Sequence, residues 1–159
     1  MLKSVHHGGV SVSSLEQALD FWEGFLEVSA RWQTVLDRPY LGQHVGYPGV
    51  RIAAAFLDLP GGGTLELLEY LNQKTHPSDP ASANPGHMHL CLAVEKIEKD
   101  WKRALTHGAI PVHHGGPVTV DGGPNRGARV AYLRVPPDRT TLGLFQTPDV
   151  SRSTGGETA

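Results

Sequence analysis

Two histidines and one glutamate stand at matching places in a sequence that repeats itself. His7 and His89 open similar segments that lie 82 residues apart (89 − 7). A second pair of similar segments, residues 64–68 and 141–145, follows at a spacing of 77 residues (141 − 64), and Glu66 lies in the first of them. A repeat of this length indicates two duplicated units that share one core.

These three side chains are of the types that bind a catalytic divalent metal. Alternate residues of a strand point to opposite faces, so His7, His89 and Glu66 are predicted to point away from the apolar residues that meet the helices. Two imidazoles and one carboxylate suit Zn, Ni, Co, Mn or Fe(II). The residue that matches Glu66 in the second half is Gly143. The duplicated site therefore predicts three protein ligands and one open coordination position, which favours catalysis over a structural metal site.

Three residues near this predicted site are candidates for proton transfer. Glu66 is both a metal ligand and a possible base, and His87 shares the predicted strand face of His89. Glu69 follows Glu66 near the end of the same predicted strand and is a candidate for the mouth of the site. We therefore predict Glu66, His87 and Glu69 as catalytic residues. Cys91 is predicted to be a small buried apolar residue.

The first half of the chain predicts a β-α-β-β-β unit. Ser13 and Glu16 form a capping box at the start of a helix whose apolar residues recur at helical spacing. The expected elements are a helix that follows its N-cap Ser13, a loop over 37–49, and strands over 4–12, 30–36, 50–59 and 64–70.

The second half repeats this order after a linker, rich in Pro and Ser, over residues 71–86. Its expected elements are a helix over 97–107 and strands over 87–94, 109–113, 128–134 and 140–146. We therefore predict an α+β fold in which two tandem βαβββ modules form one cupped, mixed, eight-stranded sheet with helices on its outer face. The modules, about 4–70 and 87–147, make a single domain over 1–147, and residues 148–159 are predicted to be a flexible tail.

The composition indicates a globular protein of a reducing compartment. Hydrophobic residues make up 39% and charged residues 19% of the chain, which excludes intrinsic disorder. A formal net charge of −2 without a Lys/Arg run argues against a nucleic-acid or anionic-membrane partner. No apolar run is long enough for a signal peptide or a membrane span. The single cysteine fits the cytoplasm, which is the expected location.

The sequence resembles the vicinal oxygen chelate superfamily of glyoxalases, bleomycin resistance proteins and extradiol dioxygenases. The resemblance extends over nearly all of residues 4–147. Its pattern is most similar to bacterial glyoxalase I-like and methylmalonyl-CoA epimerase-like proteins. The motifs that carry the resemblance are His7-x-x-x-x-Val12-x-x-Leu15-Glu16, Leu65-Glu66-Leu67-Leu68-Glu69, His89-x-x-x-x-Val94 and Pro124-Asn125-x-Gly127. The resemblance implies paired βαβββ modules around a divalent metal held by His7, Glu66 and His89, and it implies a homodimer.

One residue departs from the pattern of these relatives. In glyoxalase I and the epimerase, the place of Gly143 usually carries a glutamate that binds the metal and also moves protons. Without this group the expected base is missing, because a water molecule that fills the coordination position does not replace a base of tuned pKa.

The sequence leaves three functions open. The first is a metal-dependent lyase or isomerase that acts on a small oxygenated substrate and stabilises an enolate. The second is an Fe(II) dioxygenase, since two histidines and one carboxylate with open positions form a facial triad. The third is a non-enzymatic binder of small molecules or drugs, of the bleomycin-resistance type.

Overall fold

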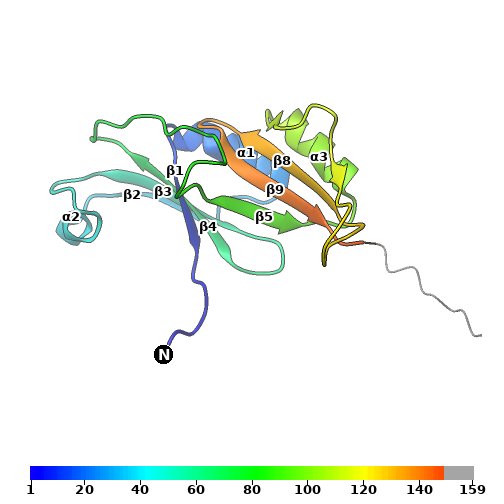
Figure 1. Cartoon of the computed structure of the whole chain (residues 1–159). Coiled ribbons are helices and arrows are strands. Elements are labelled where there is room, and N and C mark those ends of the chain that lie inside the picture. Colours follow the sequence, from blue (N-terminus) through cyan, green and yellow to red (C-terminus); the bar gives the residue numbers. More distant parts are fainter. Residues whose placement is uncertain (149–159) are drawn as a thin grey trace, which may run out of the picture.

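The computed structural model describes residues 1–148 and has the predicted α+β architecture of two βαβββ modules (Figure 1). The predicted tail over 148–159 lies outside the described residues, apart from Pro148. The first module contains β1 (Gly8–Ser11), α1 (Leu15–Leu26), β2 (Trp32–Leu36), α2 (Pro39–Val45), β3 (Ile52–Asp58) and β4 (Thr64–Tyr70). The second contains β5 (His89–Ala93), α3 (Ile97–Thr106), β6 (Ile110–Pro111), β7 (Val118–Thr119), β8 (Arg129–Val135) and β9 (Thr140–Gln146).

The strands are divided between two sheets, whereas the sequence predicted one eight-stranded sheet. The first module forms a four-stranded sheet in the order β1-β4-β3-β2, and the second forms a five-stranded sheet in the order β5-β9-β8-β6, with β7 also paired to β8. In each sheet the first strand pairs in parallel with the last strand of its module. Strands β1 and β5 thus each lie at a sheet edge, and no strand pair joins the two sheets within residues 1–148.

The register of the strands confirms the internal repeat. Gly9 lies opposite Glu66 in the β1–β4 pair, and Cys91 lies opposite Gly143 in the β5–β9 pair. His7 stands two residues before Gly9, and His89 stands two residues before Cys91. The residues that matched in sequence therefore also occupy matching positions in the two sheets.

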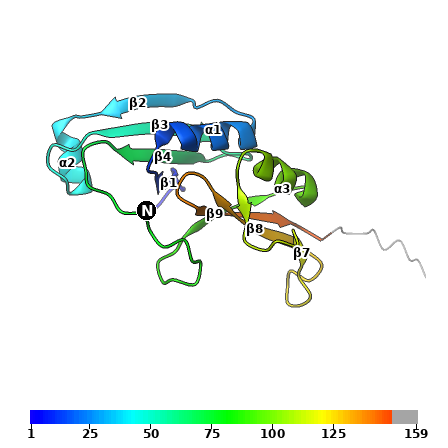
Figure 2. The same cartoon turned by 90° about the horizontal axis from the view of Figure 1, so that it is seen from above.

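One apolar core extends across both modules. Helices α1 and α3 contact each other and each packs on its own sheet, so the modules lie next to one another (Figure 2). The core contains Phe21 and Phe25 of α1 together with Leu67 of β4, Ala104 of α3 and Leu144 of β9. In the described residues 1–148 we find no helix that has both the length and the apolar character needed to cross a membrane.

Two local predictions are corrected by the structure. The side chain that caps α1 is Ser14, whose Oγ accepts from the Gln17 N–H at 3.3 Å, and Ser13 instead donates its N–H to Asp138. The predicted loop over 37–49 contains helix α2, because Pro39 presets a helical φ at the first position and Gly46 ends the helix at a φ of 79°.

Candidate active site

His7 and Glu66 come together on the face of the first sheet that α1 does not cover. His7 Nε2 lies 3.2 Å from Glu66 Oε2, and the side chains are 37% and 17% exposed. On the other side of the His7 ring, Nδ1 lies 2.7 Å from Nδ1 of His6, a contact that orients the ring. Gly9 gives the carboxylate room, because a Cβ at this position would lie 3.4 Å from Glu66 Oε2.

Aromatic rings border this pair. Phe56 lies opposite Glu66 in the β3–β4 register, and its ring is stacked on the His7 ring with centroids 6.2 Å apart. Trp32, on the neighbouring strand β2, packs against Phe56 at a centroid distance of 5.0 Å. The imidazole and the carboxylate therefore meet beside an apolar wall, which lowers the local dielectric and strengthens their interactions.

His89 lies on the second sheet, where it contacts a tyrosine that was not predicted from the sequence as a site residue. The Tyr132 hydroxyl lies 3.1 Å from His89 Nε2, and the two rings are tilted with centroids 4.9 Å apart. Tyr132 is opposite Gly143 in the β8–β9 register, so it holds the place in module two that Phe56 holds in module one. Tyr132 is identified by the pairing of β8 with β9, which cannot be read from the linear sequence.

The two halves differ by a reciprocal exchange of glycine. Module one has Gly9 on its first strand and Glu66 on its last, whereas module two has Cys91 on its first strand and Gly143 on its last. A Cβ at Gly143 would lie 3.0 Å from Cys91 Sγ and 3.2 Å from the Tyr132 ring. The space that a fourth metal-binding carboxylate would need is therefore filled by the thiol and the tyrosine.

Within residues 1–148 no group of three His, Cys, Asp or Glu side chains is placed to hold one metal ion. The structure brings His7 and Glu66 together on the first sheet and places His89 on the second. One chain thus presents a two-ligand part and a one-ligand part of the predicted site.

The remaining candidates lie in different surroundings. His87 Nε2 is 2.7 Å from Oγ1 of the buried Thr141, to which the Arg134 guanidinium also donates. Glu69 points to the opposite face of β4 from Glu66, and its carboxylate accepts from the Leu15 N–H at 2.8 Å, at the start of α1. This contact satisfies one of the free N–H groups of the helix.

The exposure of Cys91 corrects a further prediction. The residue is exposed, whereas the sequence predicted a buried apolar residue. Its thiol is nevertheless partly covered by the protein, and this burial raises the pKa of Cys91 above its ordinary value.

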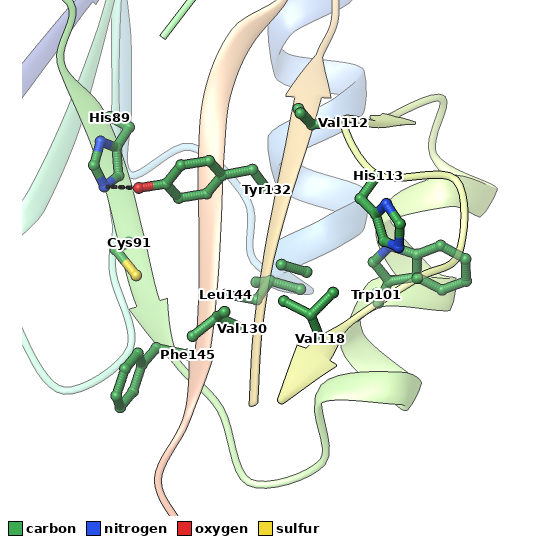
Figure 3. A pocket seen from close by; sticks show the side chains of 12 residues that line it. His89, Cys91, Trp101, Val112, His113, Val118, Val130, Tyr132, Leu144 and Phe145 are labelled. Atoms are coloured by element: carbon green, nitrogen blue, oxygen red, sulfur yellow. Dashed lines mark hydrogen bonds between the residues drawn. The ribbon is translucent and has the colours of Figure 1, made fainter. Parts of the chain in front are cut away.

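A pocket of about 560 Å³ opens on the second module beside His89 (Figure 3). It is lined by His89, Cys91, Trp101, Val112, His113, Gly116, Val118, Val130, Ala131, Tyr132, Leu144 and Phe145. This volume lies in the range of small-molecule sites, and most of the lining is aliphatic or aromatic. The arrangement can accept an apolar ligand with a polar group directed to His89 and Tyr132.

Solved structures with the same fold support a common architecture. The chain is 22% identical to a glyoxalase family protein from Bacillus cereus, with a TM-score of 0.78 over 93% of this chain and 96% of that one. A glyoxylase/bleomycin resistance protein/dioxygenase domain from Frankia sp. EAN1pec is 19% identical, with a TM-score of 0.64 over 92% and 99%. The fosfomycin resistance protein FosX from Mesorhizobium loti is 14% identical, with a TM-score of 0.54 over 91% of each chain. Likeness at these identities shows the fold alone.

No curated protein matches the sequence. A sequence profile, in contrast, matches residues 6–132, a span that includes His7, Glu66, His89 and Tyr132. With the two βαβββ modules and their matching registers, this match shows that the chain belongs to the glyoxalase/bleomycin resistance protein/dioxygenase superfamily.

Proposed function

We propose that the protein is a metal-dependent lyase or isomerase of a small oxygenated substrate, with an active site assembled across a homodimer. The observation that carries the proposal is the 3.2 Å separation of His7 Nε2 and Glu66 Oε2. Two ligand atoms each about 2.1 Å from one ion are roughly 3.4 Å apart in a tetrahedral site and roughly 3.0 Å apart in an octahedral one. The spacing of the pair therefore fits a shared ion.

The third ligand would come from a second copy of the chain. His89 is exposed and begins β5, a strand at the edge of its sheet, while His7 immediately precedes β1, an edge strand of the other sheet. A twofold dimer could bring these edges together and would form two equivalent sites. Each site would contain His7 and Glu66 of one protomer and His89 of the other.

The side chains of the chain have separable tasks in this proposal. His7, Glu66 and His89 would hold a divalent ion, which would supply Lewis-acid stabilisation of negative charge on a substrate oxygen. His6, in contact with His7 Nδ1, keeps Nε2 directed at Glu66. Because Gly143 provides no carboxylate, proton transfer is assigned to Glu66 or to His87, which Thr141 holds in place.

Mixing two inactive variants tests both the ligands and the dimer. His7→Ala and His89→Ala should each abolish tight binding of Zn²⁺ or Ni²⁺ to chelator-treated protein in isothermal titration. After the two variants are unfolded together and refolded, about half of the dimers are mixed, and each mixed dimer has one intact site. The mixture should therefore recover about one quarter of the wild-type sites. The control is His114→Ala, which changes an exposed histidine outside the proposed site.

Each outcome of the mixing experiment has a definite meaning. Full metal binding by the His89→Ala variant alone would refute the three-ligand site, and no recovery in the mixture would refute its assembly across two chains. Activity is tested by hydrogen exchange at the α-carbon of candidate substrates in deuterated water. Iron-dependent oxygen uptake with a catechol would instead identify a dioxygenase, because the same ligands suit Fe(II).

The apolar pocket favours a second candidate function, the sequestration of a small molecule without chemistry. Such a binder would hold its ligand equally well after metal removal, and Glu66→Ala would leave the affinity unchanged. A loss of ligand binding on metal removal, restored by adding the ion back, would exclude this candidate.

A further inference from the structure

The pocket in module two lies beside an interrupted edge of its sheet. Strand β6 ends at Pro111 and β7 begins at Val118, and both pair with β8. In between, the Val112 N–H donates to the Tyr132 carbonyl at 3.0 Å, and further along Gly116 lies beside Trp101 of α3. Ala131 and its neighbours on β8, Val130 and Tyr132, line the pocket beside this gap.

The wall of this pocket consists of rings and branched aliphatic side chains. Trp101 of α3, Tyr132 of β8 and Phe145 of β9 contribute rings from three different elements (Figure 3). The segment between β6 and β7 closes on the indole, since a Cβ at Gly116 would lie 3.9 Å from the Trp101 benzo ring. Val118 is 44% exposed, so an occupant would remove apolar surface from water.

Polar groups lie at one end of the pocket. The Tyr132 hydroxyl and His89 Nε2 are joined by the 3.1 Å contact, and Figure 3 shows this pair at the side of the pocket away from Trp101. A tyrosine hydroxyl can donate and accept at once, so it can bind a further oxygen while it keeps its contact with the imidazole. Flat rings prefer to pack against other rings in offset or edge-to-face arrangements.

We propose that this pocket binds an aromatic molecule that carries a hydroxyl or carbonyl oxygen. The ring lies on the apolar lining at Val118 and Val130, and the oxygen hydrogen-bonds with Tyr132 at the His89 end. The inference deepens the proposed function, because it gives the oxygenated substrate an aromatic body and places its oxygen beside the proposed ligand His89. Binding of the ring itself does not require a metal.

The test uses 1-naphthol as the probe and full-length, chelator-treated protein, with affinity measured by isothermal titration. We expect saturable binding with one probe per chain. Val118→Glu should weaken it at least about tenfold, because the probe would bury a charge that is exposed in the free protein. The matched control is Val35→Glu, which changes a 45% exposed strand valine in the first module and should leave the affinity unchanged.

A second variant tests the oxygen contact. Tyr132→Phe should weaken 1-naphthol binding about three- to tenfold and leave naphthalene binding unchanged, because it removes one hydrogen bond and keeps the ring. Equal effects on both probes, equal effects of the two valine variants, or no saturation by 1-naphthol would each overturn the proposal. A change in oligomeric state caused by Val118→Glu, without probe binding to the wild type, would also overturn it and assign the face to a second copy.

These readouts separate the pocket from the metal site. Failure of 1-naphthol binding with intact metal titrations refutes the aromatic pocket alone. Failure of the metal titrations with intact probe binding refutes the proposed metal chemistry alone.

Discussion

Introducing a carboxylate at position 143 tests whether the two halves are structurally equivalent. In module two a Cβ at this position would lie 3.0 Å from Cys91 Sγ, and 3.2 Å from both Cys91 Cβ and the Tyr132 ring. Carbon atoms in optimal contact are about 3.5–4.0 Å apart, so the neighbours must move. Overpacking of this kind costs about 1–3 kcal/mol. We expect Gly143→Glu to lower the free energy of unfolding by this amount, and the melting temperature by roughly 2–12 °C.

The reciprocal substitution should relieve the crowding. Cys91→Gly recreates at module two the space that Gly9 gives to Glu66, where a Cβ would lie 3.4 Å from the carboxylate oxygen. The double variant should therefore be more stable than the sum of the single effects predicts, with a coupling free energy of about 1 kcal/mol or more. Gly143→Ala in the same two backgrounds separates the effect of the Cβ from that of the charge.

Denaturant unfolding of the four proteins measures the coupling as a double-mutant cycle. Strictly additive effects would refute the reasoning, because they would mean that the thiol does not fill the place of the missing carboxylate. A metal titration of the double variant provides the functional readout. If the proposed site is correct, its affinity for Zn²⁺ should exceed that of the wild type, since a fourth protein ligand joins His7, Glu66 and the second histidine.

Three further predictions concern individual contacts. Glu69→Gln should destabilise the protein by about 1 kcal/mol in thermal unfolding and leave metal titrations unchanged, because Glu69 accepts from Leu15 at the α1 N-terminus. Since burial raises the pKa of Cys91, its alkylation by iodoacetamide in the folded protein should need a higher pH than in the unfolded protein. The contribution of the neutral Cys91 thiol to the free energy of unfolding should be present below the thiol pKa of the unfolded chain and be lost as the pH rises through the thiol pKa of the folded chain. Alkylation of the folded protein at a lower pH than the unfolded protein would contradict the prediction. Gly46→Ala should lower the free energy of unfolding by about 1–2 kcal/mol in denaturant unfolding, because the φ of 79° is strained for alanine. The control is Gly122→Ala, where the φ is not positive and an added Cβ would meet no atom within 4 Å.

The sequence predicted the elements that have a strong local signal. Strand β4 over 64–70 and strand β9 over 140–146 have the predicted bounds, because their alternating apolar residues are bounded by turn-forming Gly and Pro. Helix α2 was missed since Pro and Gly, which indicated a loop, are equally suited to the first position and the end of a short helix. The cap of α1 was displaced by one residue because Ser13 and Ser14 are equivalent in type, and a long-range contact with Asp138 decides between them.

The candidate site could be predicted only as far as the repeat extends. The repeat identified His7, Glu66, His89 and the exception at Gly143, since each depends on a position within one module. It gave no information on how the two sheets are placed relative to each other, because no residue pattern encodes the pairing of their edges. The Tyr132–His89 contact was missed for a related reason, since it depends on which residues of β5, β8 and β9 are neighbours.

The reciprocal placement of glycine also explains why the two halves have different surface chemistry. In module one Gly9 leaves space for a charged group, Glu66, which then requires a partner such as His7. In module two Gly143 leaves space for Cys91 and the Tyr132 ring, and a ring in that place extends the apolar pocket up to His89. A half-buried charge and an apolar ligand require opposite surroundings. The duplicated fold separates them, because the carboxylate ligand of the proposed ion lies on one sheet and the body of the proposed substrate lies on the other.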